Sequence, residues 1–128
     1  MNEYRIANIS VGMVESFSRA ITDEMMSQFL AITGDVNPLH IDESFAKSKG
    51  FPDCVTYGML TASLISTLGG CYIPGKYCLI NGVEIKFAKP VFVGDVLTVT
   101  GEVSRVDIDL KYLEIKVTIQ NQKNEKVF

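Results

Sequence analysis

The sequence predicts a protein of the α+β class, in which an antiparallel sheet packs against one strongly apolar helix. Residues 56–68 are apolar nearly all round, with only Thr and Ser as polar members. A helix of that composition is typically buried in the middle of a protein. The second half of the chain alternates apolar and polar side chains in successive runs. Such runs are typical of antiparallel strands with one buried face, and the combination defines the class.

The first half of the chain predicts one strand and two helices before the apolar helix. Residues 13–21 alternate as a strand does, although the period slips. Residues 22–34 predict a helix, because Thr22 is a good N-terminal cap and Gly34 a good C-terminal stop. A second, short helix is expected over residues 42–50.

The second half predicts three strands. Apolar residues alternate with charged or polar ones over residues 83–87, 97–104 and 113–120. Residues 89–95 break the first run from the second, and residues 121–125 predict a hairpin turn after the third.

Length and composition indicate one globular domain over residues 1–128. Hydrophobic residues are 47% and charged residues 21% of the chain, as in ordinary folded domains. Net charge is −3 and the basic residues are scattered, so we expect no nucleic-acid partner. The longest weakly polar run, residues 57–70, is shorter than the roughly 20 residues that span a bilayer, so we expect no membrane partner.

The cysteines and the histidine bear on compartment and cofactors. Cys54, Cys71 and Cys78 have no C-x-x-C spacing and fit free thiols in a reducing cytoplasm. With one histidine in the chain, we expect neither a metal site nor a cofactor. The segment Gly70–Lys76 has the spacing of a phosphate-binding loop, but it follows a helix and lacks the Ser or Thr after its lysine. It therefore predicts a glycine-rich turn.

The only histidine, His40, lies five residues after Asp35 in "GDVNPLHIDESFA". Pro38 stiffens the segment and keeps Asn37 extended, so a rigid turn places the two side chains. One interpretation is a catalytic acid–base pair. The other is an ordinary turn made by Asp35 and Asn37, with His40 on the surface or packed in the core. The residues alone leave both open.

This segment, residues 34–46, resembles the signature of the MaoC-like dehydratases, which include the (R)-specific enoyl-CoA hydratases. "YGMLTASL" at residues 57–64 and "FAKPVFVGDVLTV" at residues 87–99 resemble the start of that family's central helix and the strand pair after it. The likeness covers almost the whole chain. It implies the hotdog fold, a curved antiparallel sheet wrapped around a long central helix. It also implies a homodimer or larger homo-oligomer.

The resemblance implies a hydro-lyase that adds water to trans-2-enoyl thioesters of CoA or acyl carrier protein. Asp35 and His40 would hold the water between them. The N–H of Gly58 would bind the thioester oxyanion, and Ser63 and Asn37 would be further substrate-binding residues. The alternatives are that Gly58 only permits tight packing and that the Ser63 hydroxyl bonds back to its own helix.

Two departures from the family pattern stand out. Family members often carry a second histidine where this chain has Tyr57, a difference we expect to bear on the pocket rim or on substrate preference. Residues 126–128 look like the opening of a final strand that family members continue, so the last strand is truncated or the sheet is completed differently. Competing functions are an acyl-CoA thioesterase of the same fold and a non-catalytic subunit that binds acyl thioesters.

Overall fold

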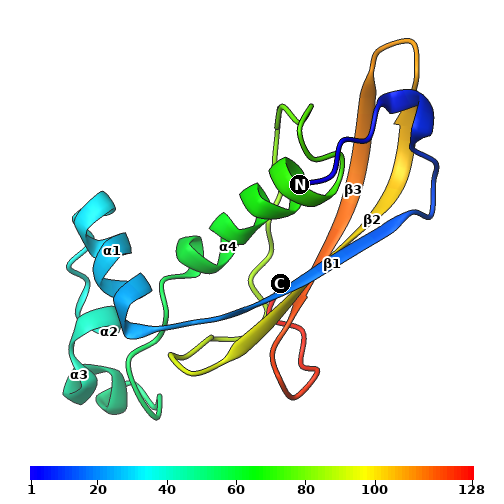
Figure 1. The fold of residues 1–128 in the computed structure, drawn as a ribbon. Helices are drawn as coiled ribbons and strands as arrows, with labels where there is room; N and C mark the ends of the chain where they lie inside the picture. The colour runs from blue at the N-terminus through cyan, green and yellow to red at the C-terminus, as the bar shows by residue number, and fades with distance from the viewer.

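The chain forms a three-stranded antiparallel sheet with a helix along one face and three further helices beyond one end (Figure 1). The computed structural model describes all of residues 1–128. This arrangement confirms the predicted α+β class. In chain order the elements are η1 (Ile6–Asn8), β1 (Val14–Ala20), α1 (Asp23–Thr33), α2 (Pro38–Ile41), α3 (Glu43–Ser48), α4 (Gly58–Thr67), η2 (Leu68–Tyr72), β2 (Val96–Asp107) and β3 (Tyr112–Gln120).

The sheet has the order β1-β2-β3, so β2 is its central strand. Val14 lies opposite Glu102 in the first antiparallel pair, and Val99 lies opposite Ile119 in the second. The alternation predicted from sequence for β2 and β3 is confirmed, since Val99 and Ile119 are both fully buried. The predicted strand at residues 13–21 is confirmed as β1.

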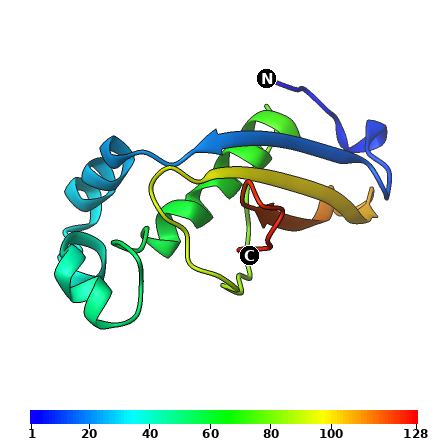
Figure 2. The same cartoon turned by 90° about the horizontal axis from the view of Figure 1, so that it is seen from below.

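Helix α4 and the π-helical turn η2 form one continuous rod against a face of the sheet (Figure 2). The two layers approach closely at Gly101 of β2, where an added Cβ would lie 2.8 Å from Leu68 Cδ2 and 3.0 Å from Ile115 Cγ2. This helix is covered by the sheet on one side only, and on its other side Met59 is 60% exposed. Its composition predicted burial all round, which the remainder of this chain does not provide.

The helix predicted over residues 22–34 is confirmed with both of its caps. The Thr22 hydroxyl accepts a 3.2 Å hydrogen bond from the Met25 N–H, and Gly34 ends the helix in the left-handed region with φ 69°. The second predicted helix is α3, which Asp42 caps by accepting from the Phe45 N–H.

The one-turn helix α2 was not predicted. Asn37 is extended as expected, with φ −56° and ψ 126°, and its Oδ1 accepts a 2.9 Å hydrogen bond from the Leu39 N–H. Pro38 then occupies the first helical position, where its missing N–H costs nothing. His40 therefore lies on a short helix, not on an irregular turn.

The strand predicted over residues 83–87 is wrong for this chain. Residues 79–87 are extended, but they form no ladder and no backbone–backbone hydrogen bond. Leu79 is 84% exposed and Phe87 55% exposed. The alternation of apolar and polar residues indicates only which side chains face an apolar surface. A β-ladder also requires a neighbouring backbone, and none lies within hydrogen-bonding reach of this segment.

The two predicted turns are present. Residues 121–125 reverse the chain, with Asn124 at φ 58°, and Lys126 then forms a bridge with Gln120. At the other site Gly70 still lies inside η2, so the glycine-rich turn begins only at Ile73 and includes Gly75 at φ 85°. None of the helices has the length and apolar character needed to cross a membrane.

Candidate active site

A cavity of about 810 Å³ opens at the N-terminal end of α4. Asp35, His40 and Phe87 line it, and so does Gly58 at the start of α4. Both residues of the candidate pair therefore reach the same cavity. Its volume is in the range of small-molecule sites, which are typically about 300–1,000 Å³.

Asp35 is held by the turn that follows α1. Its backbone N–H donates to Thr33 Oγ1 at 3.2 Å, and its Oδ1 accepts from the Asn37 N–H at 3.0 Å. One carboxylate oxygen thus shapes the turn, while no protein hydrogen bond engages the other. The turn interpretation and the catalytic interpretation of Asp35 are compatible, because Oδ1 accepts the hydrogen bond of the turn and the other carboxylate oxygen is free.

His40 is fixed through one ring nitrogen. Its Nδ1 lies 2.7 Å from the carbonyl oxygen of Val55. A carbonyl oxygen only accepts, so Nδ1 carries a proton in this pair. In the neutral imidazole the lone pair is then on Nε2, which is the nitrogen able to take up a proton.

Tyr57 connects the two residues of the pair. Its hydroxyl donates a 2.8 Å hydrogen bond to the backbone carbonyl oxygen of Asp35, and its ring centroid lies 4.2 Å from that of His40. The side chain is 2% exposed. Burial, with a smaller contribution from the Asp35 carboxylate, raises the pKa of Tyr57 above its ordinary value, so the hydroxyl stays a donor. Sequence reasoning had singled out Tyr57 only as a departure from the family pattern.

Gly58 is the first residue of α4, and the preceding Tyr57 supplies no side-chain cap. The N–H groups of a first helical turn have no carbonyl partner in the helix and lie at its positive end. An added Cβ on Gly58 would lie 2.9 Å from Phe87 Cε1. The packing alternative therefore also holds, since a side chain here would press on the aromatic wall of the cavity.

Ser63 and Asn37 each use a side-chain oxygen in a local hydrogen bond. Ser63 lines the cavity, but its hydroxyl donates a 2.6 Å hydrogen bond to the Leu60 carbonyl oxygen of its own helix. Asn37 does not line the cavity, because its amide oxygen caps α2. The Asn37 amide oxygen thus takes part in the turn, and a substrate-binding role for Asn37 stays a prediction.

The thiols of Cys54 and Cys78 show no sign of activation. Burial raises the pKa of Cys54, with smaller contributions from Asp53 and other nearby carboxylates, and burial raises the pKa of Cys78. A thiol nucleophile requires the opposite shift. Neither cysteine lines the cavity that holds Asp35 and His40.

Solved structures define the class of fold. The chain superposes on the (R)-hydratase from Aeromonas caviae with a TM-score of 0.88 and 34% identity, covering 93% of this chain and 90% of that one. An R-hydratase from Pseudomonas aeruginosa also gives 0.88, at 28% identity, covering 96% and 79% of the two chains. The protein thus has the predicted hotdog fold, with α4 and η2 as its central helix.

Sequence comparisons give the family. The family described as "MaoC like domain" matches residues 8–127. The (R)-specific enoyl-CoA hydratase of Aeromonas caviae is 37% identical over 102 residues, which are 80% of this chain and 76% of the relative. That of Rhodospirillum rubrum is 29% identical, covering 87% and 77%. A mitochondrial 3-hydroxyacyl-[acyl-carrier-protein] dehydratase of Solanum lycopersicum is 34% identical, covering 78% and 58%. The chain belongs to the MaoC-like hydratase and dehydratase family.

Proposed function

We propose that this protein interconverts trans-2-enoyl thioesters and (R)-3-hydroxyacyl thioesters. The observation that carries the proposal is the placement of Asp35 and His40 on one cavity at the start of α4, with His40 held through Nδ1. Relatives of similar length are hydratases, which supports the same reaction class.

The reaction needs a base for water and a proton for carbon. His40 Nε2 takes a proton from a water molecule that the free carboxylate oxygen of Asp35 also holds. The resulting hydroxide adds to C3 of the enoyl group, and the proton on Nε2 passes to C2. The cycle uses His40 first as the base and then as the acid, while Asp35 keeps the water in place. Because one water supplies both groups, they add to the same face.

Negative charge collects on the thioester oxygen as the hydroxide adds. In this proposal the N–H of Gly58 donates to that oxygen, and the positive end of α4 adds to the stabilisation. A side chain at Gly58 would press on the Phe87 ring, so glycine keeps this wall of the cavity in place.

The acyl chain would lie along the apolar wall of the cavity, which includes Val83, Ile85 and Phe87. These residues belong to the extended segment 79–87, whose side chains are partly exposed to solvent. Val83, for example, is 53% exposed. A homodimer is part of the proposal, because a second copy would cover such a surface. Either CoA or acyl carrier protein carries the thioester, and the three free cysteines fit a reducing, cytoplasmic compartment.

The test is hydration of crotonyl-CoA, followed by loss of enoyl absorbance and chiral analysis of the product. Asp35→Asn and His40→Ala should each lower kcat by about 10²–10⁴-fold, the usual effect of losing a proton-transfer group. Asp109→Asn is the matched control, because Asp109 lies exposed in the turn between β2 and β3. Unchanged turnover in both cavity variants would overturn the assignment.

A thiol-trapping reagent in the same assay separates the competing functions. Hydrolysis by a thioesterase releases the CoA thiol, whereas hydration leaves the thioester intact. A binding subunit would retain the enoyl thioester without consuming it. Either result in the unaltered protein would replace the hydratase proposal.

A further inference from the structure

The last turns of α1 present two side chains to the cavity that holds Asp35 and His40. Phe29 and Thr33 are four residues apart, so they lie on one face of the helix, and both line the cavity. The Phe29 ring packs on Tyr57, with 4.9 Å between the ring centroids. The proposed reaction gives Thr33 no part, yet its hydroxyl contacts Asp35 directly.

The Thr33 hydroxyl makes two hydrogen bonds, both to backbone groups. Its Oγ1 donates to the Phe29 carbonyl oxygen at 2.8 Å and accepts from the Asp35 N–H at 3.2 Å. A threonine hydroxyl has one proton to donate. Because the Phe29 carbonyl oxygen takes that proton, Thr33 has none for a substrate or for water. Its route to the chemistry of the cavity is through Asp35.

The Asp35 N–H is available to Thr33 because of the way in which α1 ends. Gly34 has φ 69°, and its N–H donates to the Leu30 carbonyl oxygen at 2.7 Å. This single bond closes the helix in the simpler left-handed motif. The next N–H, that of Asp35, has no backbone carbonyl partner. The Thr33 hydroxyl accepts it instead.

Asp35 is therefore held at three points. Thr33 accepts from its N–H, and Tyr57 donates to its carbonyl oxygen at 2.8 Å. The Asn37 N–H donates to its Oδ1 at 3.0 Å. The first two bonds fix the peptide groups on either side of Asp35, and with them the direction in which its side chain leaves the backbone. The third fixes the rotation of the carboxylate, so the direction of the free oxygen follows.

We infer that Thr33 is a positioning residue for Asp35, and that its hydroxyl directs the free carboxylate oxygen toward the water shared with His40. This inference rests on the proposed function. A misplacement of about 1 Å in a reacting group can lower a rate roughly 10²-fold. Thr33 and Asp35 are both exposed to solvent, so water competes for their hydrogen bond. A moderate effect on kcat follows.

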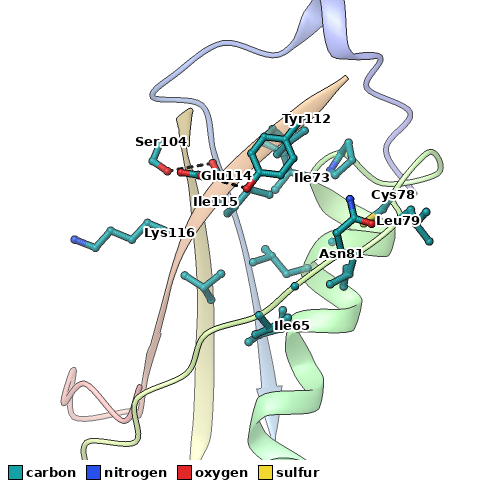
Figure 3. A pocket seen from close by; sticks show the side chains of 18 of the residues that line it. Ile65, Ile73, Cys78, Leu79, Asn81, Ser104, Tyr112, Glu114, Ile115 and Lys116 are labelled. Atoms are coloured by element: carbon teal, nitrogen blue, oxygen red, sulfur yellow. Dashed lines mark hydrogen bonds between the residues drawn. The ribbon is translucent and has the colours of Figure 1, made fainter. Parts of the chain in front are cut away.

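The larger cavity of the molecule, about 1400 Å³ beside β3, is a separate place (Figure 3). Ile65 of α4, labelled in Figure 3, lines both cavities. Thr33, Asp35 and His40 line the smaller cavity and are absent from the lining of the larger one. An effect of Thr33 on turnover therefore does not arise through the larger cavity.

The first test compares two substitutions of Thr33 in crotonyl-CoA hydration. Thr33→Val keeps the shape of the side chain and removes the hydroxyl. It should lower kcat by about threefold to tenfold and change KM by less than about twofold, because the hydrogen bond orients a reacting group and does not bind substrate. Thr33→Ser keeps the hydroxyl and should retain most of kcat.

Ser27→Ala is the matched control for the loss of a hydroxyl from α1. The Ser27 hydroxyl also donates to the carbonyl oxygen four residues back, that of Asp23, at 3.3 Å. Ser27 does not line the cavity. Its substitution should leave kcat unchanged.

A double variant separates positioning from a general effect on structure. In the Asp35→Asn background, Thr33→Val should lower kcat no further, because a residue that acts through Asp35 then has no reacting carboxylate to place. A further threefold to tenfold loss in that background, as in the unaltered protein, would assign Thr33 a role independent of Asp35 and overturn the inference.

Amide hydrogen exchange followed by NMR gives a readout that does not depend on turnover. Thr33→Val should speed exchange of the Asp35 N–H by at least about threefold, because its acceptor is gone. The neighbouring Gly34 N–H is the internal control, since it donates to Leu30 and should exchange as before if α1 still ends at the same place. An unchanged Asp35 rate would show that the hydroxyl does not hold this N–H, which overturns the inference.

Failure of the inference is distinguishable from failure of the proposed function. If Asp35→Asn lowers kcat strongly and Thr33→Val leaves kcat unchanged, only the positioning role is overturned. If Asp35→Asn itself leaves kcat unchanged, the proposed function is overturned and the inference with it.

Discussion

The Tyr57 hydroxyl donates a 2.8 Å hydrogen bond to the backbone carbonyl oxygen of Asp35, from a side chain that is only 2% exposed. The same ring lies against His40 and against Phe29 of α1. Tyr57 precedes the first residue of α4, so it connects the central helix to both members of the candidate pair. Its ring and its hydroxyl contact different groups, and substitution can separate them.

Tyr57→Phe removes the hydrogen bond to Asp35 and keeps the ring contacts. A buried neutral hydrogen bond contributes about 1 kcal/mol, so we expect that loss of stability together with a roughly tenfold lower kcat and little change in KM. Tyr77→Phe is the control, because Tyr77 is 46% exposed and lies outside this cavity. Urea melts and crotonyl-CoA kinetics measure the two effects. An unchanged kcat would show that Tyr57 does not position the pair.

Capping residues and alternation predicted most of the fold. Thr22 and Gly34 fix the ends of α1 through local contacts that a sequence displays directly. Strands β2 and β3 followed from their period because each has a neighbour in this chain. Residues 83–87 have an equally clear period and no ladder. The alternation of apolar and polar residues indicates which side chains face the core. Whether the segment pairs as a strand depends on a neighbouring backbone elsewhere in the molecule.

The sequence indicated which residues to consider for the candidate site, but it did not indicate the contacts that hold them. Asp35 and His40 line one cavity, as the motif indicated. The Val55 carbonyl that fixes His40 and the Phe87 ring beside Gly58 come from distant parts of the chain. Contacts between residues so far apart in the chain cannot be predicted from a local sequence pattern. The sequence likewise did not show that the Asn37 amide oxygen caps α2, because an asparagine side chain can either cap a helix or bind a ligand.

Gly58→Ala tests the narrow space beside Phe87. The new methyl would lie 2.9 Å from Phe87 Cε1, so the ring must move into the cavity or away from α4. We expect KM for crotonyl-CoA to rise about threefold to tenfold, because overpacking displaces the wall that contacts substrate. Adding Phe87→Leu should restore KM, since leucine lacks the ring edge. If the double variant is as impaired as Gly58→Ala, steric pressure from Phe87 is not the cause.

Gly101→Val tests the contact between the central helix and the sheet. A Cβ at this position would lie 2.8 Å from Leu68 Cδ2 and 3.0 Å from Ile115 Cγ2, both in the core region. We expect a loss of about 1–3 kcal/mol in the free energy of unfolding, as for other overpacked cores. Gly82→Ala is the control, because nothing lies within 4 Å of an added Cβ there. Equal melting temperatures for the two variants would contradict this packing.

The ion pair between Lys89 and Glu125 predicts a pH-dependent contribution to stability. The hydrogen bond from Lys89, followed by that from Asn121, lowers the pKa of Glu125 below its ordinary 4.5. A lowered folded-state pKa means that the stabilisation is present above the ordinary value and lost as pH falls through the lower one.

Lys89→Gln should therefore raise the pKa of Glu125, which carboxyl NMR titration measures directly. It should also lower the melting temperature near neutral pH, and the difference from the unaltered protein should close as pH falls below the ordinary 4.5 of the carboxyl. Lys123→Gln is the matched control, because Lys123 makes the smallest contribution to the shift. If both lysine variants move the Glu125 titration equally, the direct contact with Lys89 is not what holds that pKa down.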